Sequence, residues 1–256
     1  MSRFLALLYG ALVYLFFLAT FLYTIGFVGG VPGLKTIDNG TLVDPWIALL
    51  VDILLLSLFA VQHSVMARRG FKQRWTRIVP PPLERSTFGL AASRVLGLLV
   101  WQWRPLTDLV WAVDGAAAAA LLIGLSGLGW AMVLIATFLI NHFELFGLQQ
   151  VFENWRGRRF EPPAFRTPAL YRLVRHPIYL GFILAFWATP RMSQGHLLFA
   201  LATTGYIFIG IFFEERDLIA RFGDEYRRYR RQVPMLLPRL RLGRARAEEH
   251  PPSPAE

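Results

Sequence analysis

The chain has 256 residues, of which 55% are hydrophobic, 14% are aromatic and 17% are charged. Typical soluble domains carry about 25% charged residues, so the low charge, the mean hydropathy of +0.42 and the long apolar runs indicate an integral membrane protein. The composition excludes disordered, collagen-like and coiled-coil chains, and the absence of cysteine excludes disulfides, zinc thiolates, iron–sulfur clusters and a cysteine nucleophile.

Six apolar segments in chain order predict an all-α, polytopic membrane protein with five or six transmembrane helices. Segments 4–28 and 116–140 each hold 25 residues without a charge. That exceeds the about 20 residues that a helix needs to cross the hydrocarbon core. The other four segments are 46–66, 88–103, 177–189 and 196–213.

Two of these segments contain ionisable side chains. Asp52 and His63 lie in 46–66, and Arg94 lies in 88–103. Such groups are costly inside a membrane and need a partner or a wet cavity. Packing or snorkelling is the alternative for Asp52 and Arg94, and a satisfied interfacial histidine is the alternative for His63. The sequence leaves their roles open.

The last two segments predict a helical hairpin. They are separated by residues 190–195, which include Pro190 and Gly195, and both residue types break helices. The first arm has about 13 residues and reaches only about 20 Å at 1.5 Å per residue. Five and six complete crossings are therefore both compatible with the sequence.

The basic residues predict the orientation in the membrane. The net charge of +10 comes largely from Arg, and six basic residues lie in 68–85, six in 156–175 and ten from Arg216 onward. The intervening loops hold only Lys35, Arg104 and Arg191. Because cytoplasmic loops are enriched in basic residues, we expect both termini in the cytoplasm and no nucleic-acid partner. The Arg-, Glu- and Pro-rich tail 239–256 is predicted to be a disordered cytoplasmic segment.

The densest set of candidate site residues lies at the cytoplasmic entry to the predicted hairpin. Arg175 and His176 precede Pro177 and so stand at the positive N-terminal end of a helix, which favours anions. Gly181, one turn later, lets a ligand or a neighbouring backbone approach. The hairpin returns Glu214 and Glu215 to the same face. The alternative is that Arg175 is a positive-inside anchor with Glu214 as its ion-pair partner.

His142 lies at the cytoplasmic end of segment 116–140 and joins the same layer as His63. A satisfied interfacial histidine is again the alternative. His63, His142 and His176 are too far apart in the chain to form a close-spaced ligand pair, so no metal site is predicted.

Several motifs resemble a known family. The stretches Arg-His-Pro-Ile-Tyr-Leu-Gly at 175–181, Glu-Glu-Arg-Asp-Leu at 214–218 and Phe-Gly-Asp-Glu-Tyr-Arg-Arg-Tyr at 222–229 resemble the C-terminal signature of isoprenylcysteine carboxyl methyltransferases and related membrane methyltransferases. Upstream motifs at 59–68, 84–86, 101–105 and 141–148 are similar to the nurim-like branch, which contains the bacterial methanethiol S-methyltransferases. The resemblance runs from about residue 45 to 238.

The resemblance implies one transmembrane methyltransferase domain, 1–238, with its catalytic part at about 141–238. It implies transfer of a methyl group from S-adenosylmethionine to methanethiol, giving dimethyl sulfide, in the bacterial inner membrane. The residues that it implies around the cofactor are Arg175, His176, Tyr179, Gly181, Glu214 and Glu215.

Methyl transfer to a thiol requires the thiolate, so a base or a cationic site is expected near the acceptor. The catalytic candidates are His176, His142 and Tyr179 as base or its orienter, and Arg175 as positive charge. A prenylcysteine or phospholipid acceptor and a non-catalytic nurim-like protein are the alternatives. The expected partners are the small thiol and membrane lipid, and no obligatory protein partner is inferred.

Overall fold

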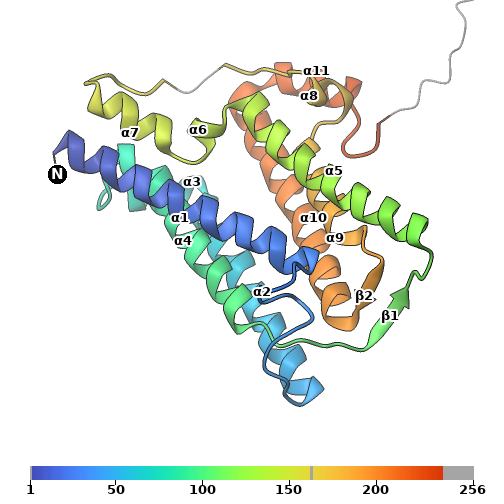
Figure 1. The fold of residues 1–256 in the computed structure, drawn as a ribbon. Coiled ribbons are helices and arrows are strands. Elements are labelled where there is room, and N and C mark those ends of the chain that lie inside the picture. Colours follow the sequence, from blue (N-terminus) through green and yellow to red (C-terminus); the bar gives the residue numbers. More distant parts are fainter. Residues whose placement is uncertain (1, 162–163, 239–256) are drawn as a thin grey trace, which may run out of the picture.

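The computed structural model describes residues 2–161 and 164–238, which form a bundle of helices with one pair of short strands (Figure 1). The tail predicted at 239–256 lies outside the described residues. The elements in chain order are α1 (Arg3–Gly29), α2 (Pro45–Ala67), α3 (Arg69–Trp75), α4 (Pro81–Gln102), β1 (Leu109–Ala112), α5 (Ala116–Ile140), α6 (His142–Leu145), α7 (Leu148–Trp155), α8 (Leu170–Leu173), α9 (Pro177–Trp187), β2 (Arg191–Ser193), α10 (Gln194–Phe222) and α11 (Asp224–Gln232).

Four helices, α1, α2, α5 and α10, are long and apolar enough to cross a membrane. The prediction of a largely helical membrane protein is thereby confirmed. The segments 88–103 and 177–189 fall in α4 and in the 11-residue α9, respectively. Neither helix belongs to the four, so the count of five or six spans stays a prediction.

The long helices turn many large apolar side chains outward. Trp46 on α2 is 78% exposed and Leu121 on α5 is 64% exposed. Hydrocarbon chains solvate such side chains, and each helix satisfies its own backbone hydrogen bonds, as a spanning segment must. A buried aromatic cluster, with Phe27, Trp103 and Phe199 among its members, ties α1, the end of α4 and α10 together inside the bundle.

Helices α5 and α9 pack with their backbones in close contact because each has a glycine at the crossing. A Cβ built on Gly129 would lie 2.6 Å from the carbonyl oxygen of Gly181, and one built on Gly181 would lie 2.7 Å from the carbonyl oxygen of Gly129. Small residues permit this kind of packing between membrane helices. Of the two possibilities predicted for Gly181, the structure shows the neighbouring backbone.

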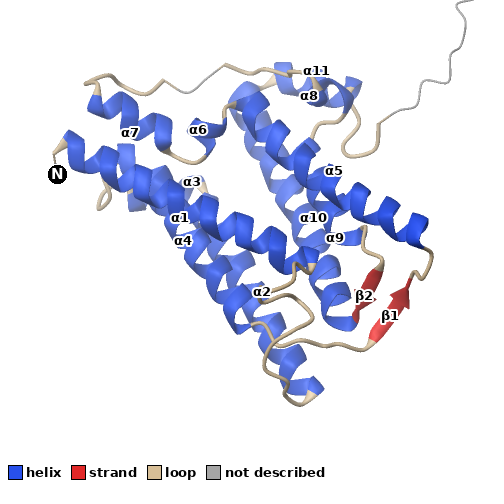
Figure 2. Cartoon of the chain, in the orientation of Figure 1, coloured by secondary structure: helices blue, strands red, loops and turns tan. Residues whose placement is uncertain are grey.

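The strands β1 and β2 form an antiparallel pair that the sequence did not predict (Figure 2). Leu109 pairs with Ser193 and Ala112 pairs with Arg191, with an irregularity between them. Strand β2 occupies part of the segment 190–195 that was predicted only as a helix break, and Ser193 then caps α10 by accepting a hydrogen bond from the His196 N–H. The all-α description therefore needs this small addition.

The two ends of the bundle differ. The short helices α6, α7, α8 and α11 lie at one end, and the strands lie at the other (Figure 1). Helix α10 continues to Phe222, nine residues beyond the predicted segment, before Gly223 ends it with a φ of 55°. This extension carries Glu214 and Glu215 to the end with the short helices.

Candidate active site

The candidate site lies where the start of α9, the end of α10 and the chain after α11 meet. The Arg175 N–H donates to the carbonyl of Pro234 at 2.9 Å, and the His176 N–H donates to the carbonyl of Met235 at 3.2 Å. The chain after α11 therefore runs alongside residues 175–176 and holds them in place.

Glu215 is the centre of the site's charged contacts. The Nε of Arg175 donates to its Oε1 at 2.8 Å, and the Nε2 of His176 lies 3.2 Å from the same oxygen. The Nε of Arg230 lies 3.4 Å from Oε2. The Glu215 side chain is only 11% exposed, so these partners compensate for the removal of its charge from water. The predicted meeting of Glu215 with Arg175 and His176 is thus observed.

Arg175 directs its donors inward. Besides Glu215, its Nη1 donates to the carbonyl oxygens of Arg230 at 2.9 Å and of Val233 at 2.7 Å. A guanidinium with these protein partners clamps the chain after α11 onto α10. Its interaction with the site is therefore chiefly one of positioning.

Glu214 is the more accessible of the two carboxylates, with 45% of its side chain exposed. The Nδ1 of His176 lies 3.8 Å from its Oε2, and the Tyr179 ring lies beside the His176 ring with centroids 5.6 Å apart. Glu214 therefore lies next to the buried ring of His176 while it still faces outward, which is the arrangement of a group that a ligand can reach.

A cavity of about 270 Å³ adjoins this cluster on the α10 side. Its lining residues are Phe212, Glu215, Arg216, Ile219 and Arg230. The mixture of one carboxylate, two guanidiniums and apolar side chains suits a ligand that has both charged and apolar parts.

Tyrosines from α8 and α11 enclose the cluster. The Tyr229 hydroxyl donates to the carbonyl of Tyr171 at 2.5 Å, and burial raises the pKa of Tyr229 to about 12. The Tyr226 hydroxyl is buried and has no hydrogen-bond partner among the described residues. Sequence reasoning did not select Tyr226, Tyr229 or Arg230 as site residues. Their spacing of three and four residues, which puts them on one helical face, was the available signal.

His142 lies in a different environment. Its Nε2 is 2.9 Å from the Tyr14 hydroxyl and its Nδ1 is 2.9 Å from the Thr137 hydroxyl. The ring stacks on Phe138 at 4.3 Å, and burial lowers the pKa of His142. These contacts run to α1 and α5, whereas Arg175, His176, Tyr179, Glu214 and Glu215 form the cluster.

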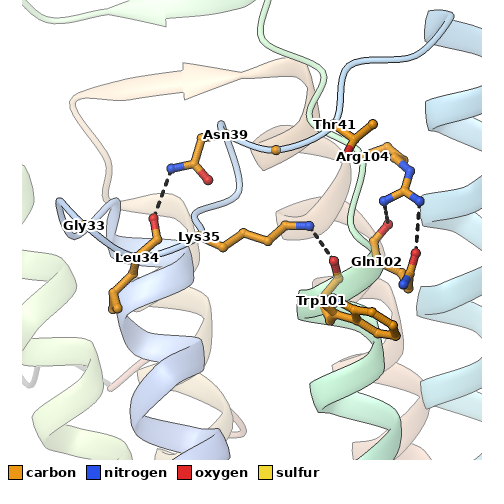
Figure 3. A pocket seen from close by; sticks show the side chains of 9 residues that line it. Gly33, Leu34, Lys35, Asn39, Thr41, Trp101, Gln102 and Arg104 are labelled. Atoms are coloured by element: carbon orange, nitrogen blue, oxygen red, sulfur yellow. Dashed lines mark hydrogen bonds between the residues drawn. The ribbon is translucent and has the colours of Figure 1, made fainter.

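The opposite end of the bundle holds a second charged cluster and a larger cavity (Figure 3). The Nζ of Lys35 donates to the carbonyls of Trp101 at 2.5 Å and Trp103 at 3.0 Å. The Oδ1 of Asp52 accepts from the Arg104 N–H at 2.9 Å. The cavity, of about 690 Å³, is lined by Gly33, Leu34, Lys35, Asn39, Gly40, Thr41, Trp101, Gln102 and Arg104. Lys35 and Asp52 thereby satisfy backbone groups at the end of α4.

Comparison with known proteins gives a consistent result. No family model matches the chain, and no solved structure matches it. "Methanethiol S-methyltransferase 1" of Bradyrhizobium diazoefficiens is 56% identical over 236 residues, which cover 92% of this chain and 83% of that protein. "Methanethiol S-methyltransferase" of Mycobacterium tuberculosis is 56% identical over 238 residues, 93% of this chain and 98% of that protein. "Nurim" of Mus musculus is a more distant relative, 29% identical over 176 residues.

Proposed function

The chain belongs to the methanethiol S-methyltransferase family, and from that membership we propose that this methyltransferase converts methanethiol to dimethyl sulfide with S-adenosylmethionine as the methyl donor. The observation that carries the proposal is an identity of 56% over more than nine tenths of the chain. The relatives named for methanethiol do not favour a lipid acceptor or a silent scaffold.

The residues of the Glu215 cluster have the chemistry that S-adenosylmethionine requires. The cofactor carries an ammonium, a carboxylate, ribose hydroxyls and an apolar base. Glu214 offers an accessible carboxylate, and Tyr226 has a buried hydroxyl without a partner among the described residues. The adjoining cavity adds guanidiniums and apolar walls. These groups would hold the cofactor from the α9–α10–α11 side.

When bound, the cofactor would supply a methyl group carried on a sulfonium, for transfer by in-line displacement with a neutral thioether as the leaving group. The protein supplies position and exclusion of water. Within the proposal, Glu214 binds the ammonium or ribose, and His176 and Tyr179 orient Glu214. Arg175 fixes Glu215, Arg230 and the chain after α11, and Gly181 allows α9 to lie directly on α5.

The topology belongs to the same proposal. We place the chain in the bacterial inner membrane with both termini in the cytoplasm, with α4 as a further crossing and with α9 and α10 as the hairpin. The basic residues at the end that holds the Glu215 cluster support this orientation. The cofactor would then enter from the cytoplasm, and 141–238 would be the catalytic part of one domain.

The direct test is labelled methyl transfer by the purified full-length protein in detergent. Methanethiol should yield labelled dimethyl sulfide, whereas a prenylcysteine and phosphatidylethanolamine should not accept the label. Transfer to one of the lipidic acceptors in place of methanethiol would contradict the proposed substrate.

A further inference from the structure

His63 lies in an aromatic surround formed by three helices. Its ring stacks on Phe59 of α2 with centroids 5.4 Å apart, lies 4.9 Å from the Phe88 ring of α4 and meets the Tyr206 ring of α10 edge-on at 6.4 Å. The charged and titratable groups that face it include Arg85 on α4 and Tyr206 on α10. The imidazole of His63 is thus a polar group surrounded by aromatic rings.

The Nδ1 atom of His63 is buried and has no hydrogen-bond partner among the described residues. The other histidines in the described part of the chain differ. Both ring nitrogens of His142 meet hydroxyls, both of His176 face carboxylates, and the Nε2 of His196 lies 2.8 Å from the carbonyl of Phe186. An unpaired buried nitrogen costs free energy, so its persistence points to a ligand that completes it.

The aromatic surround of His63 includes Tyr206, which lies on the same face of α10 as Glu214. Tyr206, Gly210 and Glu214 are spaced by four residues and therefore share a face. Tyr206 accepts a hydrogen bond from Ser64 at 3.3 Å, and a Cβ built on Gly210 would lie 3.6 Å from the Tyr179 hydroxyl oxygen. Tyr206 and Glu214 are eight residues apart, which is about 12 Å along the helix at 1.5 Å per residue. An extended ligand can touch both.

We propose that the acceptor thiol binds at Nδ1 of His63, beside Phe59, Phe88 and Tyr206, and that this nitrogen accepts its proton. This inference rests on the proposed function. A small alkanethiol has one S–H group and an apolar remainder, which match one nitrogen acceptor among aromatic rings. The S–H bond breaks, its electron pair stays on sulfur as the thiolate nucleophile, and the proton becomes the N–H of an imidazolium that later releases it to the cytoplasm.

The test compares thiols of different acidity in the purified full-length protein. His63→Gln keeps a polar side chain but cannot take up a proton. With methanethiol at neutral pH, we expect this variant to lower kcat by about 10²- to 10⁴-fold, the usual contribution of a general base. With trifluoroethanethiol, which fluorine makes more acidic and hence more ionised, the loss should be much smaller. His196→Gln, a buried histidine at the other end of α10, should affect both thiols alike.

A binding measurement tests binding of the thiol separately from its deprotonation. Fluorine NMR of trifluoroethanethiol with cofactor-free protein should show saturable binding. Phe88→Trp, which puts a larger ring beside His63, should abolish it while leaving calorimetric binding of S-adenosylmethionine intact. Equal losses for both thiols in His63→Gln, or unchanged thiol binding in Phe88→Trp, would overturn the inference. If the wild-type protein methylates neither thiol, the proposed function fails, and the fluorine signal still decides whether a thiol binds beside His63.

Discussion

The two ends of the bundle both carry buried or half-buried charges, but they use them differently. At the strand end, Lys35 donates to two carbonyls and Asp52 accepts from a backbone N–H. At the other end, Arg175 and His176 converge on Glu215 while Glu214 stays 45% exposed. The first arrangement completes the hydrogen bonds of a helix end. The second leaves a carboxylate available to a ligand.

Cavity volume alone would select the strand end as the ligand-binding region. The cavity at the strand end is about 690 Å³, whereas that beside Glu215 is about 270 Å³. The cations Lys35 and Arg104 that line the larger cavity are bonded to the protein itself: Lys35 to the carbonyls of Trp101 and Trp103, and the Arg104 guanidinium to Gln102. The hydrogen-bond partners of a charged side chain therefore indicate function in this membrane protein better than the volume of the cavity beside it.

The largest effect is expected for Glu215→Gln. Removing this carboxylate leaves Arg175 without its buried partner, and breaking a buried pair costs about 3–5 kcal/mol. We expect a lower midpoint of thermal unfolding together with loss of methyl transfer and of cofactor binding, measured by calorimetry. Glu225→Gln removes the same charge from the exposed face of α11 and should change neither. Normal stability in Glu215→Gln would show that the cluster is not held together by this carboxylate.

Glu214→Gln should separate binding from folding. Because 45% of the Glu214 side chain is exposed, its neutralisation should leave the unfolding midpoint close to that of wild type. Its loss as a charged acceptor should weaken S-adenosylmethionine binding by roughly 10- to 100-fold, on the basis of about 1.5–3 kcal/mol for a hydrogen bond to a charged group. Calorimetry measures this directly. Unchanged affinity would place the cofactor away from Glu214.

Lys35→Met tests the opposite end. The substitution keeps an unbranched chain but removes the ammonium that bonds to the carbonyls of Trp101 and Trp103. We expect a loss of about 1–2 kcal/mol in the free energy of unfolding, while kcat and KM for methanethiol stay near wild type. A loss of turnover with stability preserved would mean that the strand end takes part in catalysis.

The sequence predicted the parts of this contrast that depend on composition and chain direction. The run 116–140 coincides with α5 because an uncharged stretch of that length has no stable alternative in a membrane. The meeting of Arg175 with Glu215 followed from returning the chain to its starting face. The carbonyl partners of Lys35 were beyond prediction, because they depend on how the loop after α1 folds onto the end of α4.

Other features depend on geometry that no local pattern encodes. The strands are three and four residues long and exist only through pairing with each other. His142 was expected at the cytoplasmic face as a candidate base, but Asn141 ends α5 with a φ of 115° and α6 then packs its histidine against Tyr14 of α1. Asn tolerates this left-handed conformation, and sequence alone does not show when it adopts it.

The smallest expected effect concerns His142, which lies near the end of the bundle that holds the Glu215 cluster but whose contacts are internal, like those of Lys35. Burial lowers the pKa of His142 below 6.5, so the unfolded chain takes up a proton at higher pH than the folded protein does. Stability should therefore fall as the pH drops through 6.5, by at most about 1.4 kcal/mol per pH unit.

Burial raises the pKa of the neighbouring Glu144, which contributes with the opposite sign, so the comparison must be between variants. His142→Gln should remove part of the acid-side decline in unfolding midpoint, whereas Tyr14→Phe, which keeps the imidazole, should lower stability by a similar amount at every pH.

Turnover of His142→Gln should stay within a few-fold of wild type, since both ring nitrogens already have hydroxyl partners. A drop of about 10²-fold or more in kcat with stability preserved would instead identify His142 as the general base. It would also show that a side chain whose hydrogen bonds are all internal can take part in catalysis.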